Sequence, residues 1–253
     1  PDLEIRVTEC GTNLIGPSRL PSASKGIAAQ SSDQERILTE FYPKSQILLQ
    51  MEGVTRCDYF VFGPFLRANG QLDRGVFRRD GTAKPIWAAM RTLVASVGDA
   101  ELEGKVRIGE GRRAYVYRKP DGTHTLAFWK YSKVDLSTAA VHLGGKASSL
   151  TEGADFSVPA ADGEYEVTDI VGRRRRVSAK GGQLKLRATA YPSYVAGLGP
   201  LEVHQRPFPR GRAGARAAAL ELGLTTIVAA DLNTNDFTVA ASKDRATLRG
   251  ASA

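Results

Sequence analysis

A single carboxylate stands where a strand-like run ends near the start of the chain. Residues 5–8 read Ile-Arg-Val-Thr, which is typical of a strand, and Glu9 follows them directly. The next four residues, Cys-Gly-Thr-Asn, are typical of a turn. A carboxyl group held at a strand end can act as a nucleophile, a general acid or a general base. The competing interpretation is a surface or salt-bridged glutamate with a structural role.

Aromatic and polar side chains that could contact a ligand lie in two places. Phe62 and Phe65 belong to the apolar run CDYFVFGPF at residues 57–65, and Arg67 follows it. Aromatic rings can cover the apolar face of a ligand, and an arginine can donate hydrogen bonds to its polar groups. Asn13, in the polar segment after Glu9, is a further candidate. For each ring, packing in a hydrophobic core is the competing interpretation.

The elements expected before residue 100 alternate between strands and helices. Residues 33–53 carry apolar side chains near helical spacing, although Pro43 should bend or break this helix. Residues 57–65 are typical of a buried strand, and residues 84–98 of a helix with Pro85 in its first turn and Gly98 at its end. Together with the strand that ends at Glu9, this order predicts βα units on a parallel sheet.

Strands without helices are expected after residue 100. Turn residues separate candidate strands at 106–108, 113–119, 124–131, 139–143, 164–169, 174–178, 183–188 and 193–196. Asp121-Gly122 predicts a tight hairpin between two of them. Short strands separated by such turn residues predict an antiparallel β-sandwich. The segment 206–223 has the composition of a linker, and two or three further strand candidates follow it.

Composition narrows the class of protein. The chain has 253 residues with 42% hydrophobic content, and it contains no apolar run of about 18 residues that could span a bilayer. Cys10 and Cys57 have no histidine at a metal-ligand spacing, so neither a metal nor a cofactor is predicted. Whether these two cysteines pair stays open. The first residues lack the features of a signal peptide, and the missing initiator Met suggests that the native chain began upstream.

The net charge of +8 raises the question of a polyanionic partner. Much of the excess lies in four consecutive arginines at residues 173–176. Val171-Gly172 before the run and Val177 after it predict a hairpin turn that enters a strand, with the arginines in solvent. We therefore expect no nucleic-acid partner, and polyanion binding is the weaker alternative.

The order and spacing of these segments resemble the end of a known enzyme fold. LEIRVTECG, CDYFVFGPF and GVFRRDGTAKPIWAAMRTLVASVG are similar to strand seven, strand eight and helix eight of the retaining β-glycosidase barrels. The phrase DGTAKPIWAAM is similar to the G-x-x-KPAY-x-A ending of those barrels. HTLAFWKYS and the strands after it resemble the β-domain that trails them in families acting on β-xylosides. The resemblance covers residues 1–200.

The resemblance implies an α/β portion followed by an all-β portion. Residues 1–99 would be the C-terminal part of a (β/α)8 barrel, residues 100–200 an antiparallel β-sandwich, and residues 201–253 a linker with an incomplete further β-domain. It implies that Glu9 is the nucleophile of a retaining glycoside hydrolase. Asn13, Phe62, Phe65 and Arg67 would then bind the carbohydrate substrate.

The same resemblance implies an incomplete enzyme. Barrel strands one to six, with the Asn-Glu pair that carries the acid/base, have no counterpart in the sequence, and two strands cannot close a barrel. The chain is therefore expected to be inactive without the missing N-terminal part of the barrel. The family further implies an extracellular or periplasmic location and no membrane partner. A non-catalytic carbohydrate-binding or adhesion protein, in which Glu9 is structural, is the alternative.

Overall fold

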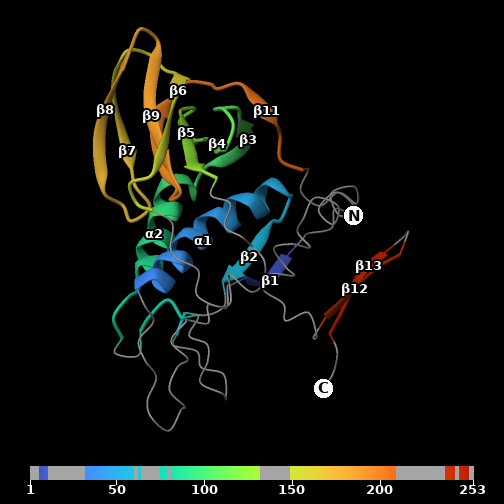
Figure 1. Ribbon diagram of the computed structural model, residues 1–253. Helices are drawn as coiled ribbons and strands as arrows, with labels where there is room; N and C mark the ends of the chain where they lie inside the picture. The colour runs from blue at the N-terminus through green and yellow to red at the C-terminus, as the bar shows by residue number, and fades with distance from the viewer. Residues whose placement is uncertain are drawn as a thin grey trace.

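The computed structural model describes residues 6–10, 32–59, 62–63, 75–78, 81–131, 149–208, 237–242 and 245–250 (Figure 1). Within these ranges the chain is β-rich, with two helices and thirteen strands. The strand expected at 139–143 and most of the expected linker lie outside the described residues.

Helix α2 (Pro85–Val97) confirms the helix predicted at residues 84–98. Lys84 precedes it with an extended backbone, Pro85 occupies its first turn, and Gly98 is its C-cap residue. Proline and glycine favour these two ends of a helix. The apolar face is buried and includes Ile86, Ala89, Met90, Leu93 and Val97.

Helix α1 (Ser32–Met51) is continuous through Pro43, so of the predicted bend or break the break does not occur. A proline inside a helix removes one backbone hydrogen bond. Leu38 on one side and Ile47 on the other are both fully buried. Packing therefore holds both halves of the helix in place across the missing bond.

Strands β1 (Arg6–Cys10) and β2 (Arg56–Tyr59) pair in parallel, which confirms the predicted direction of these two strands. Val7 and Cys57 are partners across the pair, and both pack against the buried Leu49 and Val54 at the end of α1. The Cys57 thiol also accepts a hydrogen bond of 3.3 Å from the Gln46 amide of α1. Helix α1 therefore covers one face of the parallel pair.

Nine further strands form one antiparallel sheet, and the predicted antiparallel pairing is confirmed. Its strand order is β11 (Val203–Gln205), β3 (Glu101–Val106), β4 (Arg112–Arg118), β5 (His124–Lys130), β10 (Ser193–Leu198), β7 (Gly163–Thr168), β8 (Arg174–Lys180), β9 (Gln183–Thr189) and β6 (Gly153–Pro159). Strands β6 and β11 were not predicted, and β3 begins before the predicted 106–108.

This sheet is continuous and curls on itself, whereas the expected sandwich would have two separate sheets. Phe156 of the edge strand β6 packs on Phe128 of β5 with 5.1 Å between ring centroids, although four strands separate them in the sheet. The inside of the curl is a continuous apolar core that includes Val116, Leu126 and Leu186. Curling therefore lets one sheet enclose the core that two sheets would share.

The central strands β4 and β5 are buried on both faces. Val116 and Phe128 face the inside of the curl, whereas Tyr117 and Trp129 pack on the other side against Leu93 of α2 and neighbouring helical residues. The two helices thus lie against the outer face of the sheet (Figure 1). This packing joins the βα portion of the chain to the all-β portion.

Two predicted hairpins are present. Asp121-Gly122 turns between β4 and β5, with Gly122 at φ 83°, where a glycine is favoured. The arginine run enters β8 from the β7–β8 turn, and all four arginines are exposed. Arg173 and Arg174 each lie 3.3 Å from a carboxylate, Asp169 and Glu166 respectively. Separately, β12 (Phe237–Ser242) and β13 (Arg245–Gly250) form an antiparallel pair.

Candidate functional site

The backbone of Glu9 lies at an irregular point of β1. Val7 pairs in register with Cys57, and the next pair is Cys10 with Tyr59. The register therefore advances three residues in β1 against two in β2, and the extra residue falls between Val7 and Cys10, where Thr8 and Glu9 lie. An irregularity of this kind interrupts the alternation of a strand, and bulges are common beside active sites because they re-aim side chains.

A carboxylate and a cation stand on β2 beside this irregularity. Asp58 occupies the β2 position between the partners of Val7 and Cys10. The Arg56 Nε donates to both carboxylate oxygens of Asp58, at 2.9 and 3.1 Å. Strand alternation places this pair on the face opposite the helix-covered Cys57. Neither residue of the pair was among the predicted site residues, although the alternation is visible in the segment RCDY.

Phe62 lies just beyond the end of β2 and is 50% exposed. Its ring meets the edge of Trp87 with 6.1 Å between centroids, and Trp87 packs on Phe77 at 5.6 Å. The Phe62 carbonyl accepts hydrogen bonds of 3.0 and 3.2 Å from the backbone N–H groups of Val76 and Phe77. These contacts hold an accessible aromatic ring where the parallel pair ends.

A salt bridge anchors the segment between β2 and α2. The Arg78 guanidinium donates from Nε and Nη2 to the two carboxylate oxygens of Glu35, at 2.7 and 2.6 Å. Its Nη1 donates to the Thr82 hydroxyl and the Ala83 carbonyl, at 3.1 and 2.9 Å. Glu35 belongs to α1 and is buried. Arg78 therefore ties the start of α1 to the residues that precede α2.

The other predicted site residues have no structural placement. Asn13, Phe65 and Arg67 lie outside the described residues, as does the side chain of Glu9. Among the side chains that the structure describes, no group of three or more His, Cys, Asp or Glu could hold a metal ion. In the same part of the chain, no helix is long and apolar enough to cross a membrane.

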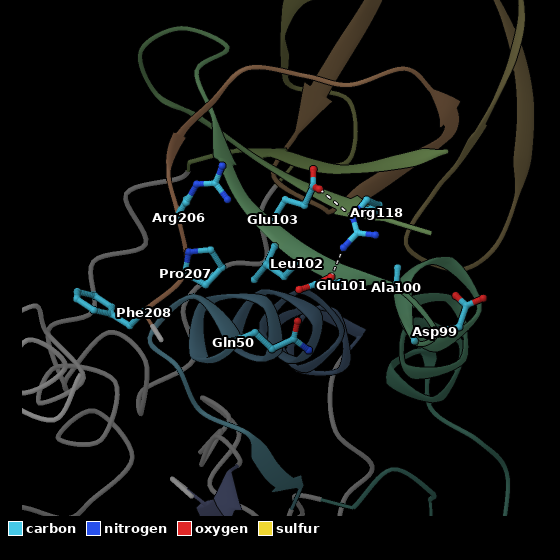
Figure 2. Close-up of a pocket in the computed structure, with 11 residues that line it drawn as sticks. Gln50, Asp99, Ala100, Glu101, Leu102, Glu103, Arg118, Arg206, Pro207 and Phe208 are labelled. Carbon is cyan, nitrogen blue, oxygen red and sulfur yellow. Dashed lines mark hydrogen bonds and ion pairs between the residues drawn. The ribbon is translucent and has the colours of Figure 1, made fainter. Parts of the chain in front are cut away.

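A second site is a cleft of about 730 Å³ between the helices and strand β3, next to the β11 edge of the sheet (Figure 2). Its walls come from separate parts of the chain: the end of α1, the turn between α2 and β3, strands β3 and β4, and the residues after β11. The lining consists of Gln50, Gly98, Asp99, Ala100, Glu101, Leu102, Glu103, Arg118, Arg206, Pro207 and Phe208. None of these residues was predicted as functional.

Ion pairs fix most of the polar side chains of this cleft. Arg118 lies between two carboxylates: its Nη2 pairs with Glu101, and its Nε donates to Glu103 at 3.1 Å (Figure 2). The other oxygen of Glu103 lies 3.2 Å from Nε2 of the buried His124. Lys119, just behind the lining, pairs with Asp99. Glu103, with a partner on each side, is the most firmly held of these acidic groups, because Glu101 and Asp99 are 67% and 64% exposed.

The fold resembles part of known glycoside hydrolases. No protein-family model and no curated protein matches the sequence. Among solved structures, the chain is similar to a family 39 glycoside hydrolase from the gut symbiont Bacteroides cellulosilyticus WH2, with a TM-score of 0.53 and 15% identity. That match covers 77% of this chain and 34% of the other, so the chain spans about a third of that enzyme's length. The chain therefore has a glycoside hydrolase-like fold.

Two further solved structures have lower TM-scores. One is the GH51 arabinofuranosidase from Xanthomonas axonopodis pv. citri, with a TM-score of 0.45, 10% identity, and coverage of 76% of this chain and 41% of that one. The other is the catalytic domain of GH30 xylanase C from Talaromyces cellulolyticus, with a TM-score of 0.42, 11% identity, and coverage of 79% and 42%.

Proposed function

We propose that the chain is the C-terminal part of a retaining glycoside hydrolase and that Glu9 is its nucleophile. The observation that carries the proposal is the parallel pair β1–β2, with its irregular register at Glu9, in a chain with a glycoside hydrolase-like fold. In this proposal, β1 and β2 are strands seven and eight of a (β/α)8 barrel. Active sites of such barrels lie at the C-terminal ends of the strands, where Glu9 stands.

The proposed reaction has two displacement steps. A Glu9 carboxylate oxygen bonds to the anomeric carbon while the bond from that carbon to the leaving-group oxygen breaks. A second carboxyl group about 5 Å away gives its proton to the leaving oxygen. A water molecule then attacks the anomeric carbon, returns a proton to the second carboxylate and releases Glu9. The second carboxyl group would come from the missing N-terminal part of the barrel.

Described side chains near the ends of β1 and β2 suit this chemistry. The nucleophile must be ionised, and a nearby cation favours the charged form of a carboxyl group. Arg56 is a cation on the neighbouring strand, but it lies at the start of β2, opposite Arg6, and is bonded to Asp58. The exposed Phe62 would cover one face of the sugar, and Asn13, Phe65 and Arg67 are proposed to contact its hydroxyl groups or rings.

The all-β portion is proposed to be an accessory β-domain that packs on the outside of the barrel. Residues 201–253 would then begin a further β-domain, and the whole enzyme would act outside the cell or in the periplasm on a glycoside or polysaccharide. In this proposal, the 253-residue chain alone is inactive, because it lacks the acid/base.

The test is made on the complete enzyme encoded by the gene. We expect Glu9→Ala to lower kcat by several orders of magnitude, because each factor of ten corresponds to about 1.4 kcal/mol and the covalent route is removed. Azide should partly restore turnover and form a glycosyl azide. A 2-deoxy-2-fluoro glycoside should label the peptide that contains Glu9, as mass spectrometry would show.

Glu110→Ala is the matched control, because Glu110 is an exposed glutamate in the turn before β4. This variant should keep wild-type activity. Near wild-type activity of Glu9→Ala would contradict the proposal and leave Glu9 structural. The chain would then be better explained as a carbohydrate-binding or adhesion module.

A further inference from the structure

We propose that the cleft shown in Figure 2 binds a neutral, short oligosaccharide. Its volume of about 730 Å³ lies within the range of small-molecule sites. The cleft adjoins the end of α1, and β2 begins shortly after that end of the helix. It therefore lies toward the N-terminal ends of the parallel strands, whereas Glu9 is at the C-terminal end of β1. The proposal does not rest on Glu9 or on its chemistry.

Charge balance in the cleft favours an uncharged ligand. Asp99, Glu101 and Glu103 contribute three carboxylates, and the cations are Arg118, Arg206 and the adjacent Lys119. An anion would meet the carboxylates that hold Arg118, and a cation would meet the guanidinium groups. An uncharged ligand with many hydroxyl groups is repelled by neither set of charges, because each hydroxyl can both donate and accept a hydrogen bond.

The polar groups of the cleft are arranged to receive such hydroxyls. The Gln50 Oε1 accepts a hydrogen bond of 3.1 Å from the Tyr117 hydroxyl, which leaves the Gln50 NH₂ group as a donor. Glu103 is fixed from two sides, by Arg118 and His124. Because these side chains are already held, little conformational entropy is lost when a ligand binds.

An apolar wall completes the site. Leu102 and Pro207 line the cleft, and Phe208 lies at its rim (Figure 2). The backbone N–H of Phe208 donates to the carbonyl of Met51 at 2.8 Å, so the residue is anchored to the end of α1. An aromatic ring at the rim can cover the C–H face of a sugar unit at the mouth of the cleft.

The test is direct binding to the 253-residue chain. Neutral oligosaccharides of xylose, glucose and arabinose would be screened by saturation-transfer NMR, and the best would be titrated by calorimetry. We expect millimolar or tighter binding that weakens about tenfold or more in Phe208→Ala and in Gln50→Ala, which corresponds to about 1.4 kcal/mol. Circular dichroism and thermal unfolding would show that each variant folds.

Tyr131→Ala is the matched aromatic control, because Tyr131 is 46% exposed and belongs neither to the cleft nor to the proposed active site; this variant should bind as the wild type does. The readout is binding and needs no hydrolysis, so a failed glycosidase proposal stays distinguishable from a failed cleft proposal. Three results would overturn the proposal. These are no binding of any neutral oligosaccharide, affinity kept in Phe208→Ala and Gln50→Ala, or preferred binding of sulfated oligosaccharides that falls steeply with salt.

Discussion

Replacing Arg78 with alanine should destabilise the region formed by α1, α2 and the segment before α2. Arg78 binds both oxygens of Glu35 at 2.6 and 2.7 Å, and Glu35 is only 7% exposed. Breaking a buried ion pair costs about 3–5 kcal/mol, because the remaining charge stays buried without a partner. The Arg78 side chain is 35% exposed, so solvent screens part of this cost. We therefore expect a loss of about 2–4 kcal/mol in the free energy of unfolding.

Urea unfolding followed by circular dichroism and tryptophan fluorescence would measure this loss. Trp87 packs on Phe77, next to Arg78, and Trp129 lies in the sheet, so single-tryptophan variants report on each region. The double variant Glu35→Met/Arg78→Met should be more stable than Arg78→Ala, because it leaves no buried charge. Arg91→Ala, at an exposed position of α2, is the matched control.

The reasoning would be refuted if Arg78→Ala unfolded within about 0.5 kcal/mol of the wild type, as ordinary surface substitutions do. It would also fail if the double variant lost more stability than Arg78→Ala alone.

Three further predictions concern the sheet. The Tyr194 hydroxyl is buried and has no hydrogen-bond partner among the described residues, so Tyr194→Phe should raise the free energy of unfolding in urea by about 1 kcal/mol. Burial raises the pKa of Tyr117 and Tyr194 above 10. The stability that depends on the neutral form of these two tyrosines is therefore fully present below pH 10, and it falls progressively as the pH rises above 10. Tyr194→Phe should make this fall in the free energy of unfolding shallower by up to about 1.4 kcal/mol per pH unit. Gly104 has φ +147°, and a Cβ there would lie 2.2 Å from the Gln205 carbonyl oxygen. Gly104→Ala should therefore lower the free energy of unfolding by more than about 1 kcal/mol and speed amide hydrogen exchange in β11. Replacing the four arginines at residues 173–176 with serine should change the free energy of unfolding little. On a heparin column, the wild type should show only weak retention that salt removes.

Local sequence patterns predicted the elements whose ends are marked by helix-capping or turn-forming residues. Helix α2 was predicted because Pro85 and Gly98 mark its ends, and the β4–β5 hairpin because Asp121-Gly122 marks its turn. The parallel direction of β1 and β2 followed from the helix between them. Strand β6 was missed because Asp, Ser and Pro interrupt its apolar residues, as an edge strand permits, and β11 has only three residues.

The features that depend on tertiary contacts were not predictable. Glu35 and Arg78 lie 43 residues apart, and nothing near either one indicates its partner. The irregular register at Glu9 depends on how β1 pairs with β2, so a pattern of single residues does not reveal it. Continuity of the sheet depends on β10, which pairs with both β5 and β7. The cleft has the same origin, because its walls come from distant segments.

The position of β10 in the sheet also constrains the order in which the all-β portion can fold. Strands β3, β4 and β5 pair as neighbours in the sequence, and β7, β8 and β9 do the same. Among the described strands, only β10, which follows all of them in the chain, bridges the two groups. During synthesis, β5 and β7 therefore keep open edges until residues 193–198 leave the ribosome. Open edges invite pairing with other chains, so this interval is when the nascent protein is most exposed to aggregation.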